Sequence, residues 1–222
     1  MQDKLIIWDF DGVIADTEKI WLQNRMMMLN DQFGLKWDLE TTNKFLGGMA
    51  DKTKKDILDK LGIQTNKEFW DLAFKKDINS MLKGFSLTEG IEDIFKIQEF
   101  NQCIATGGIA SKTKQKIEIV GIEKYFPMDK VFTADMVKFG KPEPDIFLLA
   151  AEKMGYNPKN CIVIEDSLAG MKAALKAKMF PIAFIGSDLY NKKQYTSQIK
   201  EIGIKYIFDN MKDIKKKLLT LL

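Results

Sequence analysis

Four apolar residues run directly into two carboxylates in the stretch Leu5-Ile6-Ile7-Trp8-Asp9-Phe10-Asp11-Gly12. A continuous run of β-branched and aromatic residues is typical of a strand that is buried on both faces, as in a parallel sheet. Gly12 would let the chain turn sharply after this strand. Because neighbouring carboxylates repel each other, the acidic pair needs a cation or a shared proton, although a solvated turn would also explain it.

Five further apolar runs have the same character and lead into a polar residue or a glycine. They cover residues 103–105, 131–132, 161–164, 181–185 and 206–208. Helical patterns lie between several of them, at residues 111–120, 144–154 and 167–177. This alternation predicts an α/β fold in which right-handed crossovers build a Rossmann-like open parallel sheet. Ligands bind at the carboxyl ends of the strands in such sheets, which is where most of these polar residues fall.

One long segment interrupts the alternation. Residues 16–87 show helical periodicity and no convincing strand, and they begin directly after the loop of the first strand. We therefore expect an α/β core made of residues 1–15 and 88–222, with an all-helical cap domain made of residues 16–87 inserted over the active face.

The chain of 222 residues contains no histidine. Ser-His-Asp and Cys-His relays, histidine-ligated zinc and imidazole acid/base catalysis are therefore excluded. Arg25 is the only arginine, so lysines or backbone N–H groups must hold any bound anion. An enzyme built from this chain would depend on carboxylates, lysines, hydroxyls and backbone amides.

The remaining composition indicates a globular protein with a balanced charge. The 34 basic and 31 acidic residues leave no large excess of positive charge of the kind that indicates a nucleic-acid partner. No apolar run approaches the roughly 18–20 residues of a membrane span, and the first apolar segment is too short for a signal peptide. Two cysteines make no disulfide framework and favour a reducing compartment. We expect a cytoplasmic monomer that binds neither membranes nor nucleic acids.

Three further motifs carry chemistry. Thr106-Gly107-Gly108 precedes a helix and leaves N–H groups free for a phosphate, although a loop capped by Ser111 explains it equally well. Gly140-Lys141-Pro142-Glu143-Pro144 holds one lysine in a stiff loop. Glu165-Asp166-Ser167 adds two acids at a strand end, where either Asp166 or Ser167 could also cap the next helix. A hard cation such as Mg²⁺ prefers the oxygen ligands that these acids offer.

The chain closely resembles the haloacid dehalogenase-like superfamily of hydrolases, in its phosphatase and beta-phosphoglucomutase-like subfamily with a helical cap. Four motifs carry the resemblance in the family's order, namely residues 9–13, Thr106, residues 140–147, and residues 165–167 with Gly170 and Ala173-Ala174. The resemblance covers essentially the whole chain. The strand order of the family would place Cys103 and Cys161 on strands that flank the first strand, so we expect no disulfide between them.

The resemblance implies a covalent mechanism. Asp9 would attack the substrate phosphorus, and Asp11 would act first as a general acid and then as a general base. Mg²⁺ would be held by Asp9, the backbone carbonyl of Asp11 and Asp166, with Glu165 in or next to the ligand shell.

Phosphate binding is implied by a second set of residues. Lys141, which is also counted as catalytic, and Thr106 would neutralise the transferring phosphoryl group together with backbone amides near Gly107. Gly47 and Gly48 permit close backbone approach, so their loop is expected to face the substrate from the cap.

Three alternatives within the family differ in substrate. Haloacids are disfavoured, because dehalogenases that resemble this family lack an acid equivalent to Asp11. Phosphonate hydrolysis would need a cap lysine that forms a Schiff base, but solvated helix faces explain the candidates Lys44, Lys52, Lys54 and Lys55 better. A beta-phosphoglucomutase-like phosphotransferase would hold a second phosphate with a cap arginine. Arg25 is expected to lie away from the glycine loop of the cap, which favours one phosphate over two.

A catalytically idle binding protein on the same fold is a further alternative. Such a protein would be expected to have lost one of the four motif residues Asp9, Asp11, Lys141 and Asp166, and all of them are present. We therefore predict a Mg²⁺-dependent phosphohydrolase that acts on a small phosphorylated metabolite, such as a sugar phosphate or a similar monoester, through an aspartyl-phosphate intermediate.

Overall fold

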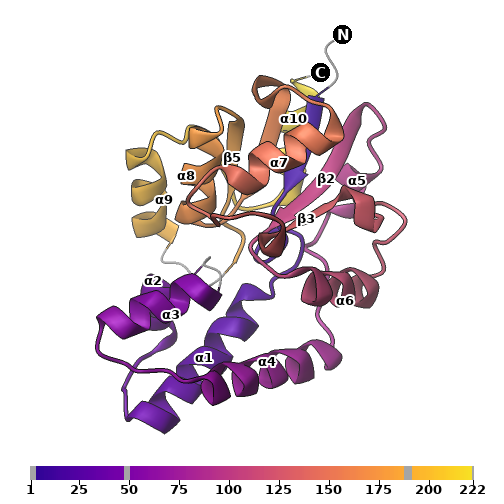
Figure 1. Cartoon of the computed structure of the whole chain (residues 1–222). Helices are drawn as coiled ribbons and strands as arrows, with labels where there is room; N and C mark the ends of the chain where they lie inside the picture. The colour runs from indigo at the N-terminus through magenta and orange to yellow at the C-terminus, as the bar shows by residue number, and fades with distance from the viewer. Residues whose placement is uncertain (1–3, 48–50, 188–191, 222) are drawn as a thin grey trace.

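The computed structural model describes residues 4–47, 51–187 and 192–221 (Figure 1). Its core is a parallel sheet with the strand order β3-β2-β1-β4-β5-β6. The strands are β1 (Lys4–Trp8), β2 (Phe100–Thr106), β3 (Val131–Thr133), β4 (Cys161–Glu165), β5 (Phe180–Phe184) and β6 (Ile207–Phe208). The predicted α/β fold with an open parallel sheet is confirmed, and each expected strand is present.

Helices cover both faces of this sheet. They are α5 (Glu92–Phe95), α6 (Ala110–Val120), α7 (Asp145–Met154), α8 (Leu168–Lys176), α9 (Lys192–Glu201) and α10 (Met211–Leu219). Short 3-10 helices occur at η1 (Met128–Lys130), η2 (Ala134–Met136) and η3 (Pro158–Asn160). Side chains of α5, α6 and α10 pack on one face, and those of α7 and α8 pack on the other.

Strand β1 lies in the middle of the sheet because its side chains are apolar on both faces. Ile6 and Trp8 join the cluster that contains α5 and α10, whereas Leu5 and Ile7 join the cluster that contains α7 and α8. This is the alternation that a two-sided strand requires. Cys103 on β2 and Cys161 on β4 are buried and free, and their strands flank β1 as expected.

Four helices of the described chain lie between β1 and α5 in the sequence. They are α1 (Glu18–Phe33), α2 (Leu39–Leu46), α3 (Asp51–Lys60) and α4 (Lys67–Leu82). They share a hydrophobic cluster of their own, which includes Leu22, Leu46 and Phe69. In Figure 1 these indigo and purple helices lie below the sheet. The helical insert agrees with the expected cap, and its bounds at residues 16 and 87 stay a prediction.

The two connections between the core and these helices run side by side. Ala15 forms an antiparallel bridge with Leu87. The backbone N–H of Thr88 donates to the carbonyl oxygen of Ile14 at 2.9 Å, and its hydroxyl donates to that of Val13 at 2.6 Å. The insert is therefore tied to the loop that follows β1. Within the described ranges, none of the helices has the length and apolar character needed to cross a membrane.

Candidate active site

Three buried carboxylates come together at the carboxyl ends of two neighbouring strands. Asp9 follows β1, Glu165 ends β4, and Asp166 comes next. The strands are held in register by the pairing of Trp8 with Ile164, which continues as a hydrogen bond of 3.0 Å from the N–H of Asp9 to the carbonyl of Ile164. One oxygen atom from each carboxylate lies within 4.8 Å of the other two.

A single buried ammonium group partly neutralises this cluster. Nζ of Lys141 lies 2.6 Å from Oδ1 of Asp9 and 2.8 Å from Oε2 of Glu165. Burial and the charge of Glu165 raise the pKa of Asp9 to about 8, although Lys141 opposes this shift. Burial and the charges of Glu165 and Asp9 also raise the pKa of Asp166 well above its ordinary value. Without a cation, the cluster therefore favours protonated carboxyl groups over more negative charge than Lys141 can balance.

The donor set fits a hard divalent cation. The three carboxylates Asp9, Glu165 and Asp166 offer only oxygen atoms, which Mg²⁺ prefers. Gly12 allows Asp166 to approach, because a Cβ at this glycine would lie 2.1 Å from Oδ2 of that aspartate. Gly170 does the same for Glu165, whose Cδ would lie 2.1 Å from a Cβ. Both glycines thus keep the space that the carboxylates occupy.

Asp11 lies apart from this cluster and has its own partners. Its Oδ2 is 2.6 Å from Nζ of Lys116, while its Oδ1 accepts hydrogen bonds from the indole N–H of Trp21 at 2.9 Å and from the hydroxyl of Thr17. Burial raises the pKa of Asp11, but the charge of Lys116 and the three hydrogen bonds outweigh burial and hold it below its ordinary value. Although Asp9 and Asp11 lie in one loop, the pKa of Asp9 is therefore raised and that of Asp11 is lowered.

Thr106 ends β2 next to β1 and is buried. Its hydroxyl oxygen accepts a hydrogen bond of 3.1 Å from the N–H of Gly108, while the space beside Gly107 is open. Helix α6 then begins at Ala110 with Ile109 at the N-cap position and no side-chain cap. The interpretation of Ser111 as the N-cap is wrong, because the helix begins one residue earlier. In the fourth motif Ser167 is the cap, and it accepts from the N–H of Gly170 at 3.0 Å.

One cavity of about 450 Å³ joins these groups. The predicted site residues that line it are Asp9, Asp11, Thr106, Gly107, Lys141, Glu165 and Asp166. Helices α1, α3 and α4 line it from the other side with Trp21, Arg25, Asp51, Thr53, Lys54, Phe74, Asp77 and Met81. The geometry therefore brings the buried carboxylate cluster, Lys141 and the separate carboxylate of Asp11 to one cavity between the sheet and the helical insert.

Comparison with known proteins identifies the family. The family model of the haloacid dehalogenase-like hydrolases matches residues 6–184. The chain belongs to the haloacid dehalogenase-like hydrolase family. It is 30% identical to the fructose-1-phosphate phosphatase of Escherichia coli over 182 residues, which cover 78% of this chain and 92% of that protein.

A second relative and a solved structure with the same fold are also similar to this chain. The beta-phosphoglucomutase of Bacillus subtilis is 28% identical over 201 residues, which cover 84% of this chain and 88% of that protein. A solved haloacid dehalogenase-like protein of unknown function from Agrobacterium tumefaciens superposes with a TM-score of 0.83, with 23% identity and 99% of each chain covered. The prediction of a haloacid dehalogenase-like phosphatase is confirmed by the family match and the curated relatives.

On the cap side of this haloacid dehalogenase-like hydrolase, the expectations for Arg25 and Lys54 need correction, whereas the substrate-facing role of Gly47 and Gly48 stays a prediction. Gly47 is the C-cap residue of α2 and is not among the described residues that line the cavity, and Gly48 lies outside the described residues. Arg25 was expected to lie away from the glycine loop, but it lines the cavity, and its Nη2 is 3.4 Å from Oδ1 of Asp51, four residues after Gly47. Lys54 was expected on a solvated face, but it is buried beside Asp51 and lines the cavity.

Several partners of the site were missed by the sequence reasoning. Lys116 and Lys112 lie four residues apart on α6, and Trp21 and Arg25 lie four residues apart on α1. Residues with this spacing share one face of a helix. The spacing therefore indicates, from the sequence alone, that the two residues of each pair contact the same neighbouring part of the protein. It does not reveal which neighbour, because that depends on how the helices dock.

The contact between Gly12 and Asp166 gives a testable prediction. Gly12→Ala is expected to lower phosphatase activity at least about a hundredfold, because the new methyl group must displace a carboxylate of the site. Gly62→Ala is the matched control, since Gly62 has a similar positive φ of 78° but nothing within 4 Å of its Cβ position. The control should lose about 1–2 kcal/mol of unfolding free energy and keep its activity. Equal activities of the two variants would contradict the contact.

Proposed function

We propose that this chain is a Mg²⁺-dependent phosphohydrolase that acts on a small phosphorylated metabolite, such as a sugar phosphate or a similar monoester, through an aspartyl-phosphate on Asp9. The observation that carries the proposal is the position of Asp9. Its carboxylate lies at the base of the cavity, 2.6 Å from the ammonium of Lys141 and within the group of three buried carboxylates.

The first step joins Asp9 to the phosphoryl group. A carboxylate oxygen of Asp9 forms a bond to phosphorus while the bond from phosphorus to the leaving oxygen breaks. Lys141 and the hydroxyl of Thr106 stabilise negative charge on the transferring group, together with backbone N–H groups near Gly107. Mg²⁺, held by Asp9, Asp166, Glu165 and the backbone carbonyl of Asp11, would supply further charge neutralisation when bound.

Asp11 handles the proton in both steps. As an acid it gives a proton to the leaving oxygen, and as a base it takes one from the water that attacks the aspartyl-phosphate, which releases phosphate and restores Asp9. The ion pair with Lys116 favours the ionised form, which is the form that accepts a proton. A substrate phosphate nearby would attract Lys116 and raise the pKa of Asp11, which favours the acid form.

The size of the cavity favours a small substrate. About 450 Å³ accommodates a phosphorylated sugar but no folded protein, and helices of the insert line the cavity on the side opposite the sheet. The curated relative from Escherichia coli is a fructose-1-phosphate phosphatase, which supports a sugar phosphate. We propose that the enzyme acts as a cytoplasmic monomer with no nucleic-acid or membrane partner.

A beta-phosphoglucomutase-like transfer is the second candidate, because the Bacillus subtilis mutase matches 84% of this chain. A panel of phosphorylated metabolites distinguishes the two functions. The proposed function predicts Mg²⁺-dependent release of phosphate from at least one sugar monophosphate and no conversion of glucose 1-phosphate to its 6-phosphate isomer. Isomerisation without phosphate release would favour the mutase, and no reaction with any ester would favour a binding protein.

Metal binding can be tested without measuring activity. The proposal predicts that Mg²⁺ raises the thermal unfolding midpoint, because a ligand that binds only the folded state stabilises it. The increase should be larger near pH 8 than near pH 6, because a pKa of about 8 for Asp9 means that protons compete with the cation at the lower pH.

The direction of this pH dependence follows from the linkage between protonation of Asp9 and folding. A carboxylate with a raised pKa in the folded state favours folding when it is protonated, so the metal-free protein loses stability as the pH rises from the ordinary pKa of about 4 towards 8. The loss of stability that bound Mg²⁺ can offset is therefore largest near pH 8. Asp166→Asn, which removes one ligand, should abolish most of the increase. An increase of the same size at both pH values, or one that survives in this variant, would contradict the assigned ligands.

A further inference from the structure

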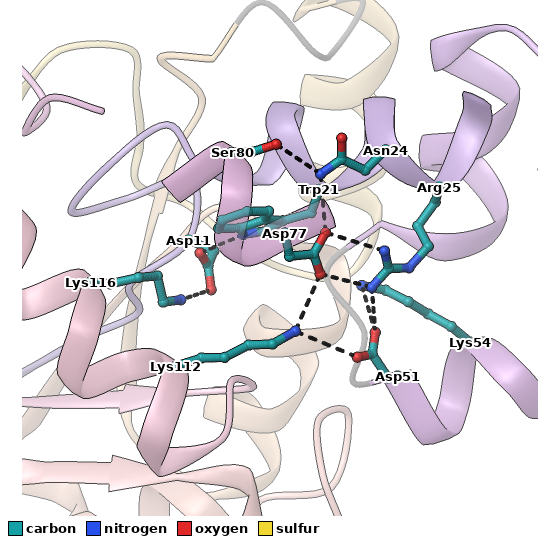
Figure 2. Close-up of polar contacts among 10 residues, drawn as sticks. All are labelled: Asp11, Trp21, Asn24, Arg25, Asp51, Lys54, Asp77, Ser80, Lys112 and Lys116. Atoms are coloured by element: carbon teal, nitrogen blue, oxygen red, sulfur yellow. Dashed lines mark hydrogen bonds and ion pairs between the residues drawn. The ribbon is translucent and has the colours of Figure 1, made fainter. Parts of the chain in front are cut away.

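A charged network covers the cap side of the cavity and is not used in the proposed mechanism. Figure 2 shows its members converging from four helices: Arg25 on α1, Asp51 and Lys54 on α3, Asp77 on α4 and Lys112 on α6. All of them line the same cavity as Asp9 and Asp11. The network therefore lies where the part of the substrate that leaves with its oxygen would be held.

The carboxylate of Asp77 pairs with the guanidinium group of Arg25. The two nitrogens Nη1 and Nη2 donate to the two oxygens of Asp77 at 3.2 and 2.9 Å, and both side chains are buried. The side-chain amide of Asn24 donates to the same carboxylate at 3.1 Å. Asp77 thus holds both Nη atoms, so this pair of donors is not free for a phosphate, whereas the buried Nε has no hydrogen-bond partner among the described residues. The only arginine of the chain is thus already paired.

Asp51 balances the remaining cations. Its carboxylate lies 3.4 Å from Nη2 of Arg25, 3.8 Å from Nζ of Lys54 and 4.0 Å from Nζ of Lys112. Lys112 also lies 3.2 Å from Asp77. Burial raises the pKa of Asp51, but the charges of Lys54, Arg25 and Lys112 outweigh burial and hold it below the ordinary value. Three cations are therefore shared between the carboxyl groups of Asp51 and Asp77.

Within this network, the carboxylate of Asp51 suits hydroxyl groups and opposes a second anion. A hydroxyl can donate to a carboxylate oxygen of Asp51, whose side chain is 47% exposed, and it can accept from a lysine. A second phosphate or a carboxylate would meet that same carboxylate and would have to draw the cations away from it. Placing like charges together in this way is a common means of rejecting a wrong ligand.

We propose that Asp51, supported by Asp77, is a specificity-determining residue that selects an uncharged, hydroxyl-bearing leaving group and rejects substrates with a second anionic group. The inference rests on the proposed function for the identity of the reacting phosphate. It goes beyond that function because it assigns the subsite for the rest of the substrate.

The test compares a hexose 1-phosphate with the corresponding 1,6-bisphosphate. Asp51→Asn keeps the shape of the side chain and removes its charge, so Arg25, Lys54 and Lys112 become available to a second phosphate. We expect the ratio of kcat/KM for the bisphosphate over the monophosphate to rise about tenfold or more. Asp56→Asn is the matched control, because Asp56 lies on the same helix, is exposed and does not line the cavity.

Binding measurements separate this inference from the proposed function. Calorimetric affinities for the two esters are measured in Asp9→Asn, with and without Asp51→Asn, so that no turnover is needed. A ratio that shifts towards the bisphosphate supports the inference, even if neither ester is hydrolysed by the unaltered protein and the proposed function fails. An unchanged ratio, or the same shift with Asp56→Asn, overturns the inference, even if the monophosphate is a good substrate.

Discussion

Asp9→Asn is expected to lower phosphate release from p-nitrophenyl phosphate at least about a thousandfold, because the variant has no nucleophile to accept the phosphoryl group. Asparagine has nearly the same shape and can still accept a hydrogen bond from Lys141, so the cavity should keep its form. The loss should therefore appear in kcat rather than in the folding of the protein. Initial rates and a thermal unfolding curve measure the two separately.

The control for this variant is a charge change of the same kind at a distant place. Asp129→Asn alters an exposed residue of η1 and should leave the rate unchanged. Activity of Asp9→Asn within tenfold of the unaltered protein would mean that water attacks phosphorus directly. The buried cluster would then serve only to bind the substrate and the cation.

Asp11→Asn is expected to separate the two chemical steps. The leaving group of p-nitrophenyl phosphate departs without a proton, so the first step should survive in this variant. Hydrolysis of the aspartyl-phosphate needs the base and should slow by about a hundredfold to ten-thousandfold. The result is a burst of one p-nitrophenolate per enzyme molecule, followed by a slow steady rate. Stopped-flow absorbance measures both phases.

A sugar phosphate should behave differently with the same variant. Its alkoxide leaving group needs the proton that Asp11 supplies, so Asp11→Asn should show no burst and little turnover with this ester. Trp21→Phe is a useful comparison, because it removes one hydrogen bond to Asp11 and keeps the carboxylate. It should retain turnover with both esters. If Asp11→Asn lost activity equally with the two esters and showed no burst, the role of Asp11 as acid and base would be contradicted.

The fold was largely predictable because its strands are short, continuous apolar runs that lead into polar residues. Strand β1 is apolar on both faces and is followed by Asp9, and a similar pattern repeats at β4, which ends at Glu165. In a parallel sheet the strand ends lie at one edge, so local sequence places these acids at that edge, and the pairing of β1 with β4 brings them together. Lys141 was predictable for a different reason, since it lies in a stiff loop between a glycine and a proline.

The cap side was not predictable in the same way. Arg25 and Asp77 are 52 residues apart and meet only because α1 packs against α4. Periodicity shows which residues share a face of one helix, but it does not give the packing of one helix on another. Lys54 shows the same limit, because lysines on a charged helix usually face solvent, and its burial depends on Asp51 and on the docking of α3.

The most direct measurement is the phosphorylation state of Asp9 during turnover. The reaction of Asp11→Asn with p-nitrophenyl phosphate is stopped with acid during the slow phase, and the protein mass and its peptides are determined. We expect close to one phosphoryl group per molecule, on the peptide that contains Asp9, and none in the double variant that also carries Asp9→Asn. A burst of product without phosphorylated protein, or a phosphoryl group on another residue, would contradict a covalent intermediate on Asp9.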